Sequence, residues 1–578
     1  MRSPVFRAEG LGLGLGALVG SLTLAYPLAL LGAIFAAFFR LPFLIGLSLV
    51  LLRGVLFPLP TPPSGPLEAE GIVRGGLFQT PSGVFHVKPP LEDGFYRLKG
   101  QVLPPSPPRL PGGLDERTWL LGQGVRGVFR VEGVLAKDPL PDVQEGFRTR
   151  LREGLSFRVA RAMEALTLGD KRDLGEYTAF QESGLAHILA LSGLHVGILA
   201  AFFAFLLFPL GPLRYLLALL GLLLYLALAG PSPSLVRASL MAGLSLIGLF
   251  LGLGRAGLLP ALGLAFFFQM LLTPWALFSL GLQLSYLATL GIALVLPALP
   301  PTRGLFGLVQ GALWTTLAAQ ALLLPLLLHH FHLLPLLSPL ANLLALPLVG
   351  LLVPLGFLKL LLGGVLAPVV EPLTRFLLAL AHLFAQGPQL TWGEISPWGF
   401  TLYYLGLFPL FLALYGKLAW PRALLLASLP AALSLLSAWP KPVEALRLGQ
   451  DAFLFRSGRA EVLFLGPREG PEGVAQALKA LGVEALEVLV AEEGQERAIQ
   501  RALPIGKVVR PHQAFALQAG GIRLKGDGRA WSLSLSEYTA RGGFRGGAVE
   551  VRGRMNRWTL PPGLKEAASL RLRLGYAW

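Results

Sequence analysis

Cysteine is absent from the 578 residues of this chain. Disulfides, thiolate metal sites and cysteine nucleophiles are therefore excluded, and the redox compartment is left undetermined. The Gly-x-x-x-x-Gly-Lys-Ser/Thr pattern is also absent, which excludes nucleotide binding by a P-loop. Acidic residues are scarce between positions 196 and 440, where eight basic residues accompany only Glu371 and Glu394. Positive loops on the cytoplasmic side of a membrane explain part of this bias, so basic charge alone does not indicate nucleic acid.

Hydrophobic residues make up 54% of the chain and charged residues 14%, and the net charge is +16. Many apolar runs approach the ~20 residues that cross a bilayer as a helix. They lie at 10–57, as two or three short spans, and at 196–211, 213–230, 234–252, 256–273, 277–297, 305–328, 336–362, 400–416 and 421–438. These runs predict a polytopic α-helical membrane protein with roughly ten to twelve membrane segments. Residues 370–390 have an amphipathic pattern instead.

The proline-rich segment 58–66 predicts a stiff linker. Short alternating segments separated by glycine and proline follow it, and they predict a five-stranded, OB-like β-barrel in residues 67–146. Barrels of this kind bind single strands by stacking bases on aromatic rings. The candidate aromatics are Phe78, Phe85, Phe95, Tyr96 and Phe129. The candidate DNA-binding basic residues are Arg74, Lys88, Arg97, Lys99 and Arg130.

A second interpretation of these aromatics is that they form the core of the barrel, and for any one of them it is the better one. The net charge of residues 67–146 is −1, which argues against strong binding of phosphates.

Residues 147–168 have apolar side chains at helical spacing with arginines between them. The pattern predicts an amphipathic helix on the membrane surface. Its basic face contacts lipid headgroups or, as the less favoured alternative, DNA.

The stretch 183–197, SGLAHILALSGLHVG, brings histidines, serines and glycines into an apolar region. Polar groups inside a membrane usually line water or contact a charge. The stretch predicts a helix broken at Ser192 and Gly193, forming a re-entrant or interfacial turn beside a cavity. His187 and His195 would each need a partner or water there. As an alternative, the spacing of Gly193 and Gly197 allows two helices to pack closely without any substrate.

Arg237 is the basic residue expected inside the membrane and facing its interior, where a lone charge costs a few kcal/mol unless it is hydrated or paired. The alternative is an arginine near a helix end that reaches the interface. Other polar groups in apolar runs either line a path or join helices. They are Gln283, Ser285, Gln320 and Asn342. The histidines at 329, 330 and 332 have no carboxylate nearby and are interpreted as interfacial rather than as a zinc site.

Several motifs together resemble one known family. AHILALSGLHVG, preceded by LTLGDKRDL from Leu166, resembles the competence signature of the ComEC family. FSLGLQLSYLATL from Phe278 and the block from Gln320 to Pro347, including SPLANLLALPLVG from Ser338, resemble two further family blocks in the same order. PGGLDERTWLLGQGVRG from Pro111 is similar to a block of the family's soluble N-terminal domain. The resemblance covers about half of the chain.

This resemblance implies a multi-pass channel of the cytoplasmic (inner) membrane that passes single-stranded DNA during natural transformation. It also implies a DNA receptor and pilus-type uptake machinery outside, a separate nuclease, and a cytoplasmic motor or strand-binding protein. No cofactor and no covalent chemistry are implied. The residues that we place on the DNA path are His187, Ser192, Gly193, His195, Arg237, Gln283, Ser285, Gln320 and Asn342.

From residue 441 the pattern changes to strands and helices, and LGQDAFLF resembles the first strand pair of the metallo-β-lactamase-like domain that often ends this family. A dinuclear metal site of that fold needs His-x-Asp-x-Asp-His, whereas Glu492–Arg497 reads EEGQER. The domain contains only His512, Asp451 and Asp527 as histidine and aspartates. We therefore expect a degenerate, catalytically inactive domain. Its basic tail either contacts DNA or is a solvated surface.

The predicted domains are N-terminal membrane segments and linker (1–66), OB-like domain (67–146), interfacial helix (147–173), channel domain (174–440) and degenerate metallo-β-lactamase-like α/β domain (441–578). A membrane-anchored nucleic-acid hydrolase acting through the last domain is the alternative function. A small-solute transporter is a third, but no internal repeat supports it.

Overall fold

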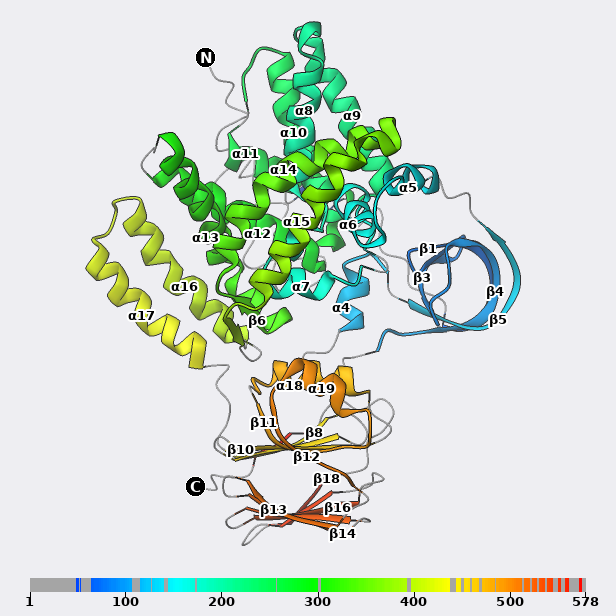
Figure 1. Ribbon diagram of the computed structural model, residues 1–578, viewed down its shortest axis with the longest axis vertical. Helices are drawn as coiled ribbons and strands as arrows, with labels where there is room; N and C mark the ends of the chain where they lie inside the picture. Colours follow the sequence, from blue (N-terminus) through cyan, green and yellow to red (C-terminus); the bar gives the residue numbers. More distant parts are fainter. Residues whose placement is uncertain are drawn as a thin grey trace. The chain divides into compact units, whose positions relative to one another are not determined.

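The computed structural model describes residues 48–50, 52, 64–106, 115–125, 127–139, 144–171, 174–255, 257–299, 303–391, 395, 397–436, 443–448, 452–457, 460–466, 470–483, 485–511 and seven short strand segments between 514 and 573. Most of the predicted N-terminal membrane segments, the motif start at 111–114, Asp451 and His512 lie outside the described residues. The chain forms two compact units (Figure 1). The first contains residues 1–105, 117–323 and 335–389, and the second contains 106–116, 324–334 and 390–578.

The first unit includes a closed five-stranded β-barrel, as the sequence predicts. Its strands are β1 (Gly65–Arg74), β2 (Leu77–Thr80), β3 (Gly83–Lys88), β4 (Gly94–Leu103) and β5 (Gly127–Pro139), in the order β1-β2-β3-β5-β4. Successive side chains of a strand point to opposite faces, and burial along β4 alternates accordingly. The barrel core contains Phe78, Phe85, Tyr96 and Phe129, each at most 2% exposed. Among the five candidate stacking aromatics only Phe95 is exposed, at 40%.

The helical part of the chain carries the apolar runs. Its helices are α4 (Glu116–Leu121), α5 (Glu145–Arg152), α6 (Phe157–Leu168), α7 (Tyr177–Glu182), α8 (Gly193–Leu206), α9 (Leu213–Ala229), α10 (Pro233–Phe250), α11 (Leu258–Leu272), α12 (Leu280–Val295), α13 (Gly304–Phe331), α14 (Ser338–Leu362), α15 (Ala367–Ala385), α16 (Pro397–Leu414) and α17 (Trp420–Leu436). Two short strands, β6 (Leu333–Pro335) and β7 (Gln389–Thr391), interrupt them.

Four segments in the described part of the chain are long and apolar enough to cross a membrane, and four shorter helices are similarly apolar. Large apolar side chains on the helices are exposed, such as Phe205 at 80% and Leu425 at 73%. Extensive exposed apolar surface is expected where the solvent is lipid. The chain is therefore a membrane protein, whereas the predicted ten to twelve segments stay a prediction.

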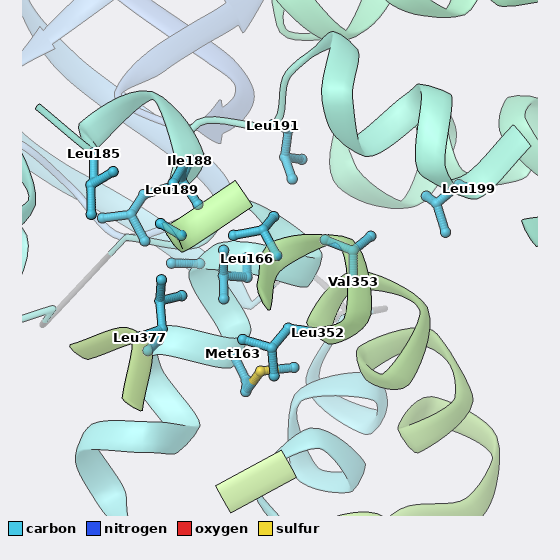
Figure 2. Packing of buried hydrophobic residues seen from close by; sticks show 14 of the residues in the cluster. Met163, Leu166, Leu185, Ile188, Leu189, Leu191, Leu199, Leu352, Val353 and Leu377 are labelled. Carbon is cyan, nitrogen blue, oxygen red and sulfur yellow. The ribbon is translucent and has the colours of Figure 1, made fainter. Parts of the chain in front are cut away.

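The single surface helix predicted over 147–168 is wrong in two respects. The segment forms two helices, α5 and α6, because the chain turns at Gly154, which has a φ of +70°. A Cβ at this glycine would lie 2.8 Å from the Cβ of Ala367, so the turn is also tightly packed. Moreover, α6 is buried from Val159 to Leu168 except for Arg161. Figure 2 shows Met163 and Leu166 among Leu185, Leu352 and Leu377, within the largest apolar cluster of the helical part.

The arginines of this segment all contact protein groups. Glu164 is 1% exposed on its side chain and pairs with Arg152 and Arg161, with N to O distances of 2.5 and 2.9 Å. Arg148 pairs with Asp170 at 3.2 Å. Arg150 donates to the carbonyl of Leu360 and Arg158 pairs with Glu176. The expected basic face is thus largely neutralised within the protein.

The last part of the second unit contains two six-stranded sheets. The first sheet has the order β12-β11-β10-β9-β8-β19, with strands β8 (Val443–Leu448), β9 (Ala452–Ser457), β10 (Ala460–Leu465), β11 (Leu486–Val490), β12 (Ile505–Val509) and β19 (Arg571–Arg573). Strands β10, β11 and β12 are parallel. Helices α18 (Pro471–Ala480) and α19 (Glu496–Ala502) lie on one side of this sheet (Figure 1) and bury Val474, Leu478 and Ile499.

The second sheet is an antiparallel meander. Its strands are β13 (Ala514–Ala519), β14 (Ile522–Asp527), β15 (Ala530–Leu535), β16 (Tyr538–Gly543), β17 (Val549–Arg552) and β18 (Arg557–Leu560). The expected strands and helices are thus present, whereas the likeness to a metallo-β-lactamase stays a prediction.

An arginine holds Glu492–Arg497, the segment that stands in the place of the metal-binding pattern. Arg510 donates to the carbonyls of Ala491 and Glu492 and forms an ion pair with Glu496 at 2.8 Å. The hydrogen bond from Arg510 lowers the pKa of Glu496 to about 2. The carboxylate is therefore committed to a structural contact in the folded domain.

Replacing Leu166 by alanine should lower the stability of the helical part by about 2–5 kcal/mol, because the substitution leaves a cavity in a fully buried cluster. Thermal unfolding of the purified protein in detergent measures this as a lower midpoint. The control is Phe157→Ala on the same helix, since Phe157 is 69% exposed. Equal midpoints for the two variants would show that α6 is not a core helix.

The ion pair of Glu496 should make the C-terminal domain sensitive to acid. Because its folded-state pKa lies below the ordinary value of 4.5, the pair stabilises the domain above that pH and loses this contribution as the pH falls towards about 2. Glu496→Gln should remove about 1 kcal/mol at neutral pH and flatten the dependence between pH 5 and 2. Amide hydrogen exchange of β11 and β12 across this pH range, compared with the exposed-site variant Glu493→Gln, measures the effect. An unchanged pH profile for Glu496→Gln would contradict it.

Candidate functional site

The stretch 183–197 is a broken helix, as the sequence predicts. Helix α7 ends at Glu182, a single 3-10 turn follows at Ala186–Ile188, and α8 begins at Gly193. The apolar residues between these helices are packed in the core, since Leu185, Ile188 and Leu189 are at most 1% exposed. The break therefore has a fixed position, directly before Gly193.

The start of α8 is closed by a capping box in which histidine takes the usual place of glutamate. The Ser192 side chain accepts from the backbone N–H of His195, and the backbone N–H of Ser192 donates to Nδ1 of His195 at 3.3 Å. Because Nδ1 accepts this bond, the neutral ring carries its proton on Nε2. The pattern Ser-x-x-His was visible in the sequence, but its capping role was missed.

Arg237 faces the interior of the helical part. Its side chain is 6% exposed. Nε donates to Oγ of Ser285 at 2.8 Å, and Nη1 donates to Oγ1 of Thr289 on the same helix, α12. The guanidinium also lies 5.8 Å from the ring centroid of Tyr286. Arg237 lies four residues after the start of α10, so the alternative of an arginine near a helix end stays open.

Gly193 lies directly beside this guanidinium. A Cβ at Gly193 would be 2.9 Å from Nη2 of Arg237. At Gly197, by contrast, a Cβ would have nothing within 4 Å. The two glycines therefore do not mark one close helix contact. The structure instead brings together five predicted path residues, Ser192, Gly193, His195, Arg237 and Ser285.

A second group of predicted residues lies around Gly184, near the other end of the stretch. A Cβ on Gly184 would be 2.4 Å from the Cβ of Ser338, at the start of α14. Gln320 donates to Oγ of Ser338 at 2.6 Å, and Nδ1 of the exposed His187 lies 3.1 Å from the carbonyl of Gly184. Asn342, one turn beyond Ser338, is 5% exposed, and its Oδ1 has no hydrogen-bond partner in the part of the chain that is described.

Gln283 belongs to neither group. Its amide donates to the carbonyl of Leu277 and so fixes the turn before α12. Nδ1 of His329 lies 3.1 Å from the carbonyl of Ile395. Within the described ranges, no three histidine, aspartate or glutamate side chains cluster as metal ligands.

The Arg237 site also contains residues that were not predicted, among them Thr289 and Gln269. Thr289 binds Arg237 directly, and Gln269 accepts from Tyr286 OH at 2.9 Å while donating to the carbonyl of Pro233. The spacing of Ser285 and Thr289, four residues apart on one helix, was the available signal. Nothing in the sequence indicated that Arg237 was their partner.

All five basic candidates of the barrel are exposed. Arg97 pairs with Glu68 at 3.0 Å and with Glu70 at 3.5 Å, which reduces its free charge. Lys88 and Arg130 occupy directly paired positions of β3 and β5. The remaining two are Arg74 and Lys99.

Residues 166–417 match the family model described as Competence protein. The chain is 30% identical over 266 residues to ComE operon protein 3 of Bacillus subtilis (strain 168), an alignment that covers 43% of this chain and 33% of that protein. It is 32% identical over 259 residues to Competence protein ComA of Neisseria gonorrhoeae, covering 41% of this chain and 36% of that protein.

The matched part therefore spans about a third of the length of each of these relatives. No solved structure matches the chain significantly. The family match includes the broken stretch, Arg237, α12 and the start of α14, which together form the two groups described above. The family match over residues 166–417 and the two relatives confirm the resemblance to the ComEC family of competence proteins.

Proposed function

We propose that this protein is a channel that moves one strand of DNA across the cytoplasmic membrane during natural transformation. The observation that carries the proposal is Arg237, a buried cation on an apolar helix that has no carboxylate partner in the described part of the chain. A charge buried in this way is costly and marks a functional path by default. A polyanion that passes close to Arg237 offsets that cost.

The broken stretch supplies the polar surroundings that such a path requires. Non-helical backbone at membrane depth persists only where protein or water satisfies its polar groups. At one end Ser192, His195 and Arg237 gather, and at the other Gln320, Ser338 and Asn342 do. Both ends thus offer hydrogen-bonding groups to a hydrated strand, while Leu185 and Leu189 between them anchor the stretch in the core.

The barrel is proposed to be an OB-like domain that receives the strand before it enters the membrane part. Its strand order, with β3 beside β5 and β4 closing onto β1, supports an OB-like arrangement. Exposed Phe95 lies on the same strand as Arg97 and Lys99, at alternate positions that share a face. One aromatic with a few basic side chains suits weak contact with a strand in transit.

The C-terminal domain is proposed to be an inactive relative of metallo-β-lactamases that binds or scaffolds. Glu496, at the position of the missing ligand pattern, is engaged by Arg510. The partners proposed are a DNA receptor and pilus-type machinery outside, a separate nuclease, and a cytoplasmic motor or strand-binding protein. The hydrolase alternative gains no support from the two relatives, whose names refer to competence.

Arg237→Gln should reduce DNA uptake at least tenfold, because the amide keeps a polar side chain but removes the buried positive charge. Transformation frequency and internalised labelled DNA, in a naturally transformable strain carrying the variant, measure this. Arg255→Gln is the matched control, since Arg255 is an exposed arginine in the loop after α10. Both variants must reach wild-type abundance in the membrane fraction.

Normal uptake by Arg237→Gln would sink the proposed path. Equal losses in Arg237→Gln and Arg255→Gln would attribute the effect to overall charge and would remove the special role of the buried site.

A further inference from the structure

The first turn of α8 exposes unsatisfied donors. This helix is 14 residues long, and the N–H groups at the start of a helix have no partner within it. The N–H of His195 is capped by the Ser192 side chain. The N–H groups of Gly193 and Leu194 have no hydrogen-bond partner among the residues that the structure describes. Their aligned dipoles give this end of α8 a partial positive charge.

The guanidinium of Arg237 adds a full positive charge at the same place. Its Nε and Nη1 are used by α12, whereas Nη2 has no hydrogen-bond partner in the described ranges. Nη2 is the atom that lies 2.9 Å from the Cβ position of Gly193. The Arg237 side chain is only 6% exposed, and its free Nη2 donor lies beside Gly193, the first residue of α8.

The histidine of the capping box contributes a third kind of donor. His195 is fully buried, and its ring folds back onto Ser192 at the N-terminal end of α8. Nδ1 accepts from the Ser192 N–H, so Nε2 carries the proton. This Nε2 has no hydrogen-bond partner in the described part of the protein. The first turn of α8 therefore contains a buried imidazole with an unused donor, in addition to the free N–H groups and the neighbouring guanidinium.

Lys359 is a buried cation in the same protein whose ammonium group has hydrogen-bond acceptors. It is 0% exposed, and its Nζ donates to the carbonyls of Glu153 at 2.6 Å and Gly363 at 2.9 Å. Lys359 thus lies at the C-terminal end of α14, where the helix dipole favours a cation. Arg237 lies at the opposite kind of helix end, where a cation is disfavoured unless an anion is bound.

We propose that Gly193, Leu194 and Arg237 form a binding site for a single phosphodiester group, with Gly193 allowing the guanidinium to lie against the start of α8. The proposal rests on the proposed DNA path and names the contact made there. Backbone N–H groups at a helix start together with a guanidinium are suited to an oxyanion. A phosphodiester carries one negative charge, which neutralises the arginine. A side chain at position 193 would push the guanidinium away from the free N–H groups with which it binds the anion.

The test uses dimethyl phosphate, the smallest phosphodiester, with the purified full-length protein in detergent. Thermal unfolding is followed while dimethyl phosphate replaces chloride at constant ionic strength. A ligand that binds only the folded state raises the midpoint with concentration. Gly193→Ala should need at least ten times more dimethyl phosphate for the same rise. The matched control Gly197→Ala should behave as the wild type, because its Cβ meets open space on the same helix.

Absence of a rise in the wild type, or an equal rise in Gly193→Ala and the wild type, would overturn the site. Should Gly193→Ala fail to fold, Arg237→Lys takes its place, since it keeps a cation but lacks Nη2, and an undiminished response there would overturn the site as well. Transformation separates this site from the path. Loss of uptake in Arg237→Gln with an undiminished phosphate response in Gly193→Ala would leave the channel standing and reject the site.

Discussion

The structure depends on how an apolar helical core accommodates charge. Five arginines of α5 and α6 contact acids or a carbonyl, and Lys359 is received by two carbonyls. These contacts let α6 enter the core although its sequence is amphipathic. Arg237 is held differently, by neutral hydroxyls of α12. Hydroxyls orient a guanidinium but do not cancel its charge, so this part of the core remains electrostatically unbalanced without an anion.

The break before α8 places free backbone N–H groups beside the uncompensated charge of Arg237. An uninterrupted helix from 183 to 206 would satisfy the N–H groups of residues 193 and 194 within the helix and leave neither of them to a ligand. The capping box uses Ser192 and His195 to fix where α8 begins, and so fixes which N–H groups stay free. Gly193 then permits the close approach of Arg237. The capping residues Ser192 and His195, Gly193 and Arg237 are separate features of the sequence, and together they determine the structure around the start of α8.

The sequence was sufficient for the features that depend on local pattern. The barrel followed from alternation, and the helix break from serine and glycine within an apolar run. The burial of α6 did not follow, because Arg158 of α6 pairs with Glu176 and Arg148 of α5 pairs with Asp170, and both acids lie beyond these helices. The partners of Arg237 are 48 and 52 residues away in sequence, a separation that no local pattern encodes. The predicted path residues could therefore be chosen only by residue type, and their grouping required the fold.

The proposed transport of a polyanion limits how strongly any one site of the channel can bind it. A strand held by many arginines would enter and not leave, because conduction needs binding that is favourable but weak. The distribution of charge agrees with this limit. The barrel offers basic side chains partly paired with Glu68, Glu70 and Glu92, and α5 and α6 neutralise theirs. One unpaired arginine beside one helix start can grip a single phosphate, and each following phosphate of the strand can then replace the one before it.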